Sequence, residues 1–209
     1  MGLIDFVLHI DVHLQQLLLA YGPWIYGILF LIVFAETGLV VAPVLPGDSL
    51  LFATGALAAS GGLNPHLVVL VLIFAAFCGD NVNYLVGHWA GKRLLNTRWV
   101  KRAYLERTQS MFERHGGKTI IIARFLPIIR TYVPFTAGLS GMPYRRFMAF
   151  SVLGSVLWVC VGIYAGLLFG GLPIVKNHFT LLILGIVLIS LLPALWGILS
   201  ARGASKTEK

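Results

Sequence analysis

Five charged residues lie within apolar stretches of this sequence, where an isolated charge is costly in lipid. They are Glu36, Asp48, Asp80, Arg124 and Arg130. An unpaired charge near the centre of a bilayer costs roughly 2.5–3.5 kcal/mol, so five would cost about 12–17 kcal/mol. We therefore expect these side chains to be paired, hydrated or both. Glu36 and Asp48 flank one break in the apolar pattern, and the two arginines flank another.

These residue types favour a site that binds an anion and carries protons. Arginine presents a planar pair of N–H donors that fits a phosphate, and it stays charged at physiological pH. We therefore predict that Arg124 and Arg130 bind the phosphate of a lipid. A carboxyl group withdrawn from water holds its proton more tightly, which predicts proton coupling by Glu36, the acid deeper in its apolar run, and by Asp48.

Two plainer interpretations of the same residues stay open. The acids and arginines alone would also form a structural ion-pair network between two halves of the molecule. Asp48 follows Pro46-Gly47 and would also serve to cap the next helix. Polar residues nearby are predicted to support the site, although asparagines in membrane helices commonly bridge two helices. These supporting residues are Asp80, which is equally well explained as a bridge, Asn83 and Thr131.

The motifs of metal sites and of common enzymes are absent from the sequence. No Cys/His cluster has metal-ligand spacing, and there is neither a nucleophile elbow nor a phosphate-binding glycine loop. An intramembrane phosphatase would need a nucleophile near the arginines, for which only Ser49, Thr131 and His115 are available. We therefore expect no metal, no cofactor and no enzyme activity.

The composition indicates that the surroundings of these residues are lipid. Of the 209 residues, 58% are hydrophobic and 11% are charged, against about 25% charged in soluble domains. A soluble globule of this size cannot bury so much apolar surface, which argues against a cytosolic enzyme, a nucleic-acid-binding protein and a secreted disulfide scaffold. The net charge of +8 comes from basic clusters at 92–118 and 202–209, which mark cytoplasmic loops and favour anionic headgroups.

The apolar pattern predicts an all-α protein that crosses the membrane several times. The N-terminus lacks the basic segment and cleavage site of a signal peptide, so we expect none to be removed. The predicted elements are an amphipathic interfacial helix over 3–20, an apolar arm over 24–42, a short apolar piece over 50–59, a span over 66–90, a basic surface helix over 92–117, a second short piece over 118–126, and spans over 147–170 and 179–199.

Two of these apolar pieces are too short to span. Ten residues of helix rise only about 15 Å, half of the hydrocarbon core. Proline and glycine bound both pieces, so each is predicted to be one arm of a re-entrant hairpin. The predicted hairpin breaks are Pro43, Pro46, Gly47, Pro127, Pro134 and Gly138.

The two predicted hairpins are similar in sequence. Leu-Pro at 45–46 recurs at 126–127, and Phe-Ala-Thr-Gly at 52–55 resembles Phe-Thr-Ala-Gly at 135–138. The basic residues place the end of one span and the start of the other on the same side, so the repeats should be antiparallel. Inverted repeats with broken helices are typical of transporters, with the site at the midplane. The following spans carry matching glycines, Gly79, Gly87 and Gly91 in one and Gly154, Gly162 and Gly166 in the other.

Two stretches resemble the signature motifs of the bacterial DedA family, within the VTT/SNARE-associated superfamily. The first runs from Glu36 to Leu50, and the second from Gly116 to Met142. The resemblance covers nearly the whole chain. It implies a single domain over 1–209, with repeats at about 24–90 and 118–170, a cytoplasmic basic linker at 91–117 and a C-terminal span at 178–200.

The resemblance also implies a function. Members of the family are linked to flipping of undecaprenyl phosphate, or of phospholipids such as phosphatidylethanolamine, and to the proton-motive force. The family's essential acids and arginines correspond to Glu36, Asp48, Arg124 and Arg130. We therefore expect an inner-membrane lipid flippase with a cytoplasmic C-terminus, whose partners are a phosphate-headgroup lipid and protons and not nucleic acid.

Other functions remain open at this stage. The acids would bind the substrate in a proton-coupled exporter of small cations or drugs, with the arginines as counter-ions. An uncoupled lipid scramblase and a structural membrane factor are further alternatives. The oligomeric state is also open, with a homodimer as one candidate.

Overall fold

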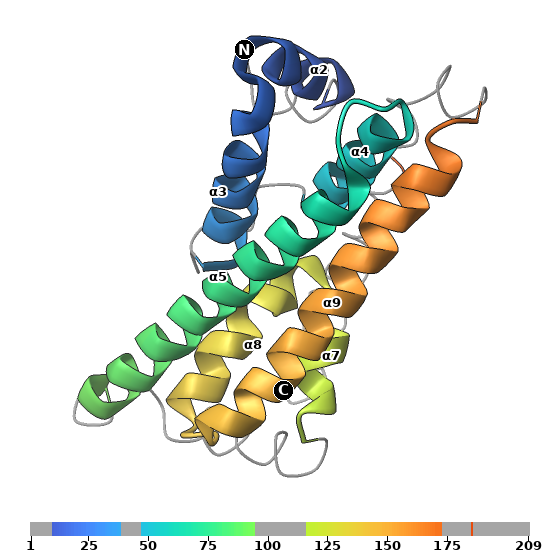
Figure 1. Cartoon of the computed structure of the whole chain (residues 1–209). Helices are drawn as coiled ribbons and strands as arrows, with labels where there is room; N and C mark the ends of the chain where they lie inside the picture. Colours follow the sequence, from blue (N-terminus) through green and yellow to red (C-terminus); the bar gives the residue numbers. More distant parts are fainter. Residues whose placement is uncertain (1–9, 39–46, 95–115, 173–184, 186–209) are drawn as a thin grey trace, which may run out of the picture.

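The computed structural model describes residues 10–38, 47–94, 116–172 and 185 of the chain. The regular secondary structure within these ranges is helical (Figure 1). Several predictions lie outside them: Pro43 and Pro46, most of the basic linker, the C-terminal span and the first residues of the amphipathic helix. The helices are α2 (Ile10–Tyr21), the 3-10 turn η1 (Gly22–Trp24), α3 (Ile25–Gly38), α4 (Gly47–Ala59), α5 (Pro65–Leu94), α7 (Lys118–Ala123), α8 (Pro127–Leu139) and α9 (Tyr144–Phe169).

Three helical stretches are long and apolar enough to cross a membrane. They are Gln16–Gly38, Pro65–Ala90 and Tyr144–Phe169. The last two have 26 residues each and are about 39 Å long, more than the roughly 30 Å of a hydrocarbon core. They confirm the spans predicted at 66–90 and 147–170. The all-helical class is also confirmed for the described residues.

The chain turns sharply inside the first of these stretches, between α2 and α3. Gly22 has φ +52°, a conformation that glycine adopts without steric cost, and Pro23 follows it in η1. Figure 1 shows α2 lying across the end of α3. The break predicted between the two helices is thus confirmed. The apolar stretch begins earlier than predicted, at Gln16, because the four residues before Tyr21 are all apolar.

Two shorter helices, α4 and α8, have 13 residues each, about 20 Å of rise. The second short piece predicted at 118–126 is α7, which ends at Ala123, and α8 begins at the predicted break Pro127. The breaks predicted at Pro134 and Gly138 are wrong, because α8 continues through both residues. Proline removes only one helical hydrogen bond, and membrane helices tolerate this.

Both short helices end in the same way, which the sequence analysis missed. Gly61 and Gly141 follow α4 and α8 with φ +81° and +73°. The amide of the next residue bonds the carbonyl five positions earlier, over 3.2 Å to Leu57 and 3.1 Å to Ala137. This is the Schellman arrangement, which favours glycine at its left-handed position. A Ser-Gly pair closes each helix.

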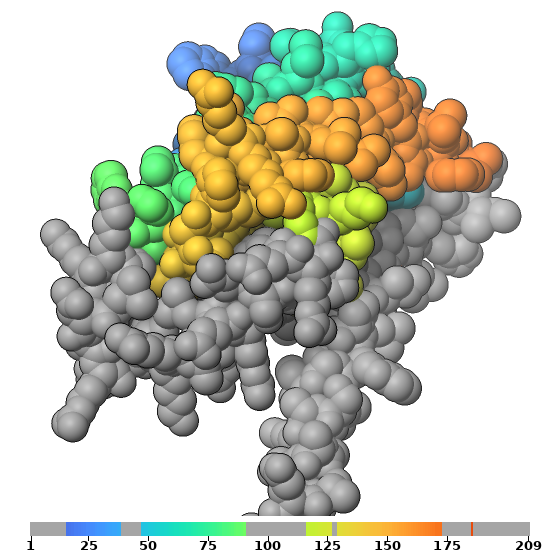
Figure 2. Space-filling view, turned by 90° about the horizontal axis from the view of Figure 1, so that it is seen from below, coloured from blue at the N-terminus to red at the C-terminus, as the bar shows by residue number. Residues whose placement is uncertain are grey.

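Each short helix packs on a long helix from the other half of the chain. Helix α4 packs on α9 and α8 packs on α5 (Figure 1). Figure 2 shows α7 against α9 from below. A Cβ on Gly55 would collide with the carbonyl oxygen of Ile163, and one on Gly138 with that of Tyr84. In lipid, small residues allow this close backbone approach, on which helix association depends.

The two interfaces are alike in their contacts. Gly166 lies against the backbone of Phe52, and Gly87 lies against the backbone of Phe135. These phenylalanines open the two four-residue motifs that match in sequence. In the sequence, the spacing of the glycines made Gly87 of the first span equivalent to Gly162 of the second. In the structure, the residue equivalent to Gly87 is Gly166, because these two glycines make the like contacts. The difference is four residues, about one helical turn.

Candidate functional site

Arg130 brings the two predicted proton-coupling acids together. It lies in the first turn of α8, and its side chain is 6% exposed. One Nη atom pairs with Glu36, near the end of α3, and Nη1 lies 3.1 Å from Oδ1 of Asp48, near the start of α4. Three residues far apart in sequence thus form one ion-pair cluster, as their charges predicted.

Glu36 is the most deeply buried member of this cluster, with a side-chain exposure of 0%. Its Oε1 accepts a hydrogen bond of 3.0 Å from the backbone N–H of Gly47, the first residue of α4. Helix N-termini favour negative charge. A Cβ on Gly47 would overlap the Glu36 carboxyl group, so the glycine allows this approach. Oε2 of Glu36 has no hydrogen-bond partner among the described residues.

Asp48 is the accessible acid of the cluster, with 25% of its side chain exposed. Its Oδ1 also accepts a hydrogen bond of 2.7 Å from Nε1 of Trp158, on α9. The Trp158 ring lies 4.9 Å from the guanidinium carbon of Arg130 and 5.7 Å from that of Arg124. These are cation–π distances. Trp158 was not among the residues predicted from the sequence, although a tryptophan in mid-span is a signal, because membrane tryptophans gather at the interfaces.

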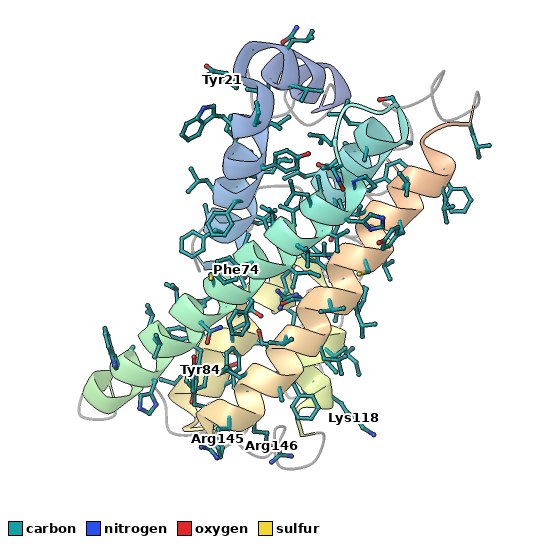
Figure 3. All side chains as sticks on the ribbon, viewed as in Figure 1. Tyr21, Phe74, Tyr84, Lys118, Arg145 and Arg146 are labelled. Carbon is teal, nitrogen blue, oxygen red and sulfur yellow. The ribbon has the colours of Figure 1, made fainter. Side chains whose placement is uncertain are left out.

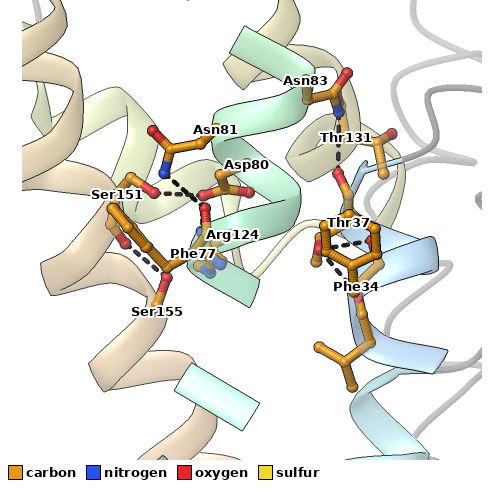
Figure 4. Close-up of polar contacts among 11 residues, drawn as sticks. Phe34, Thr37, Phe77, Asp80, Asn81, Asn83, Arg124, Thr131, Ser151 and Ser155 are labelled. Atoms are coloured by element: carbon orange, nitrogen blue, oxygen red, sulfur yellow. Dashed lines mark hydrogen bonds and ion pairs between the residues drawn. The ribbon is translucent and has the colours of Figure 1, made fainter. Parts of the chain in front are cut away.

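The second arginine pairs with an acid outside the Arg130 cluster. Arg124 directly follows α7 and pairs with Asp80 of α5 (Figure 4). Both side chains are 4% exposed. Ser151 of α9 donates a hydrogen bond of 2.7 Å to Oδ2 of Asp80, a contact that the sequence did not indicate. Asp80 therefore pairs with one of the two arginines and also bridges α5 to α9, so both interpretations of this residue fit its contacts.

Asn83 links the segments that carry Glu36 and Arg130. Its Nδ2 donates to the carbonyl oxygens of Thr37, at 3.0 Å (Figure 4), and Thr131, at 2.8 Å. These two residues directly follow Glu36 and Arg130 in the chain. The helix-bridging role expected of asparagine is thus observed, and Thr131 contributes its backbone to it.

A small cavity borders both arginines. Its volume is about 10 Å³, room for about one water molecule. Asp80, Trp158 and Ile120 also line it. Nε and Nη2 of Arg124 and Nε of Arg130 are buried without a hydrogen-bond partner among the described residues. The cluster therefore holds unused cationic donors beside a polar cavity. No group of three or more potential metal-binding side chains occurs in the part of the chain that the structure describes.

Known proteins similar to this chain are membrane proteins. The VTT domain model matches residues 45–168. The chain is 51% identical to Protein DedA of Escherichia coli K12 over 99% of its own length and 97% of that protein. It is 42% identical to an uncharacterized membrane protein of Mycobacterium leprae, over 85% and 82% of the two chains, and 38% identical to Inner membrane protein YghB of E. coli K12, over 74% and 72%. No solved structure matches.

The match includes most of the charged cluster. Asp48, Asp80, Arg124, Arg130 and Trp158 fall within the VTT match, and the E. coli DedA match extends along nearly the whole chain. Three stretches long enough to span a membrane agree with these relatives. The chain is an inner-membrane protein of the DedA family and carries a VTT domain over residues 45–168.

Proposed function

We propose that this protein moves a phosphate-bearing lipid across the bacterial inner membrane and couples the movement to protons. Undecaprenyl phosphate and a phospholipid are the candidate substrates. The observation that carries the proposal is the pair of buried arginines around one cavity, Arg124 and Arg130, in a protein whose helices α5 and α9 are long and apolar enough to cross a membrane. Ionisable residues inside membrane proteins are rare and mark substrate paths and proton relays.

The hydrogen-bond donors of the arginines suit a phosphate. Arg130 already binds two carboxylates through its two Nη atoms, and phosphate oxygens form the same charge-assisted bonds. Two donors of Arg124 have no hydrogen-bond partner within the described part of the chain, and a phosphate oxygen would satisfy them. A phosphate would thus replace an acid on Arg130 and gain contacts with Arg124. The present cavity holds about one water, so it must widen to admit a phosphate.

The charge balance of the cluster supports proton coupling. Three carboxyl groups, Glu36, Asp48 and Asp80, face two guanidinium groups among the described residues. One proton in the cluster would balance its charge, and uncompensated buried charge is strongly unfavourable. An arriving phosphate adds negative charge and therefore favours further protonation. Substrate binding and proton binding would then strengthen each other, which is the linkage that coupled transport needs.

The finer architecture belongs to the same proposal. We infer that α3 with α4, and α7 with α8, form two re-entrant hairpins of an inverted repeat. The 20-Å length of α4 and α8, their like contacts with the opposite long helices and their shared Ser-Gly ends support it. Lys118, Arg145 and Arg146 lie at one end of the molecule (Figure 3), which would face the cytoplasm.

Transport by the purified full-length protein tests this function. Proteoliposomes would be assayed with labelled undecaprenyl phosphate, labelled phosphatidylethanolamine and free inorganic phosphate, each with and without a pH gradient. Arg130→Lys keeps the charge but loses the planar fork, so it should slow lipid transport by about tenfold, as expected for one lost charged hydrogen bond. Arg145→Lys, at an exposed position, is the matched control and should transport normally. Equal rates for the two variants would contradict phosphate recognition by Arg130.

One observation favours a second candidate, a proton-coupled exporter of small cations. The excess carboxyl group of the cluster, with the accessible Asp48, would bind a cation. The same proteoliposomes distinguish the two functions, because a cationic dye would then move against the gradient while the phosphate lipid would not. Lipid movement without any response to the gradient would instead indicate an uncoupled scramblase.

A further inference from the structure

An open groove lies between α4 and α9, outside the cavity that the arginines share. Its volume is about 230 Å³, smaller than the roughly 300–1,000 Å³ of pockets that hold whole drug-sized ligands. Its walls are mostly apolar. They include Leu51 and Phe52 of α4, and Val161, Gly162 and Ala165 of α9.

The groove meets the charged cluster at its polar end. Asp48 lines the groove and pairs with Arg130. Trp158 lines both the groove and the arginine cavity, so its ring forms a wall between them. Phe125, on the groove side, directly follows Arg124 in the chain. The apolar groove and the arginine donors are therefore neighbours, separated by the side chains of Trp158 and Asp48.

We propose that this groove holds part of the hydrocarbon chain of the phosphate lipid while its headgroup occupies the arginines. This inference rests on the proposed function. The volume fits a segment of one chain rather than a complete lipid. Val161 is 58% exposed on a candidate span, so the groove opens where hydrocarbon surrounds the protein. Burial of apolar chain against apolar walls is favourable, and the polar end supplies cations for the attached phosphate.

The arrangement of the wall defines what must move. Trp158 and Asp48 are joined by the indole N–H, and both lie between the groove and Arg130. A phosphate reaches Arg130 from the groove when this hydrogen bond opens and Asp48 leaves the guanidinium group. Gly162 allows α9 to approach α4 closely along the groove, because a Cβ there would lie 2.7 Å from Cβ of Leu51. Movement of the Trp158 and Asp48 side chains would open the path.

Photo-cross-linking of the full-length protein in proteoliposomes tests the groove. The probe is phosphatidic acid with a diazirine on one acyl chain, compared with the same diacylglycerol lacking phosphate. Cross-linked peptides are located by mass spectrometry. We expect phosphatidic acid to label α4 near Phe52 and α9 near Val161 and Ala165, and diacylglycerol to label them about tenfold less, the ratio expected for one lost charged hydrogen bond.

Two tryptophan variants give a matched comparison. Val161→Trp fills the groove mouth and should lower its labelling by about tenfold, because roughly two CH₂ groups of the lipid chain would lose their burial. Val152→Trp adds the same side chain at another exposed position of α9 that does not line the groove, and should leave labelling unchanged. Three results would overturn the inference. The first is even labelling over exposed apolar residues such as Leu31 and Leu70. The others are equal labelling by both lipids, and labelling mainly at a contact surface between two copies of the protein.

Transport separates this inference from the function on which it rests. If wild-type protein transports the phosphate lipid and Val161→Trp transports it as fast as Val152→Trp, the groove proposal fails while the proposed function survives. If wild-type protein transports no phosphate lipid, the proposed function fails whatever the labelling pattern. A transport rate lowered only in Val161→Trp, together with lost labelling, supports both.

Discussion

Removal of the Asp80 carboxylate tests how strongly its pair with Arg124 stabilises the protein. Both side chains are 4% exposed. Asp80→Asn leaves the guanidinium group buried without its counter-ion, and breaking a buried pair in this way typically costs about 3–5 kcal/mol. For a protein of this size each kcal/mol shifts Tm by about 2–4 °C, so we expect Tm to fall by roughly 6–20 °C. The assay is thermal unfolding of the purified full-length protein in detergent.

A second variant separates the ion pair from its individual members. Arg124→Met removes the cation and leaves Asp80 as the uncompensated buried charge, so it should also lower Tm. The double variant contains neither charge. Replacing a whole buried pair by neutral side chains is often nearly neutral or stabilising, so the double variant should regain most of the Tm lost by Asp80→Asn.

Lys118→Met is the matched control for this cycle. Lys118 is an exposed cation at the first residue of α7, the helix that Arg124 follows. Surface charges contribute at most about 1 kcal/mol, so its Tm should change by less than about 4 °C. A Tm for Asp80→Asn no lower than that of Lys118→Met would refute the reasoning, as would a double variant as unstable as the summed single variants.

Three other predictions concern packing, topology and coupling. Gly138→Ala should destabilise by about 1–3 kcal/mol because its Cβ meets the Tyr84 carbonyl, whereas Gly27→Ala, with open space around it, should not lower Tm. Cysteines at Ser60 and Ser140, just after α4 and α8, should react with impermeant reagents from opposite membrane faces; labelling from one face would end the inverted-repeat proposal. Glu36→Gln should bind lipid yet lose the response of transport to a pH gradient, and retained acceleration by the gradient would remove Glu36 from the proton path.

The sequence was informative about elements and about which residues are unusual. Apolar runs of sufficient length predicted the spans at 66–90 and 147–170, and Gly22-Pro23 predicted the turn after α2, because these features depend on local composition and backbone preference. The cost of charge in lipid singled out Glu36, Asp48 and Arg130, which the structure brings together.

Contacts between distant segments could not be predicted in the same way. Three acids and two arginines allow several pairings. The packing of the helices decides that Arg124 pairs with Asp80 and not with Glu36. Glycine spacing aligned the two halves of the sequence only to within a helical turn. The correct alignment depends on which backbone carbonyl each glycine contacts. Pro134 was misinterpreted because a proline interrupts a helix only where its lost hydrogen bond is not tolerated. Trp158 could not be predicted because its contacts are with residues far from it in the chain, Asp48 and Arg130.

The position of Asn83 argues against the ion pairs serving only to hold the two halves together. Its amide group bonds the carbonyls that directly follow Glu36 and Arg130, and these neutral bonds do not depend on the protonation of any acid. These bonds would therefore hold the backbones on both sides of the ion pair if the side chains exchanged partners. Among the described residues, the cluster has a separate neutral bridge, one more acid than arginine and unsatisfied donors on both arginines, which are the properties expected of a site whose charges rearrange. Such rearrangement is what alternating between a proton and a phosphate requires.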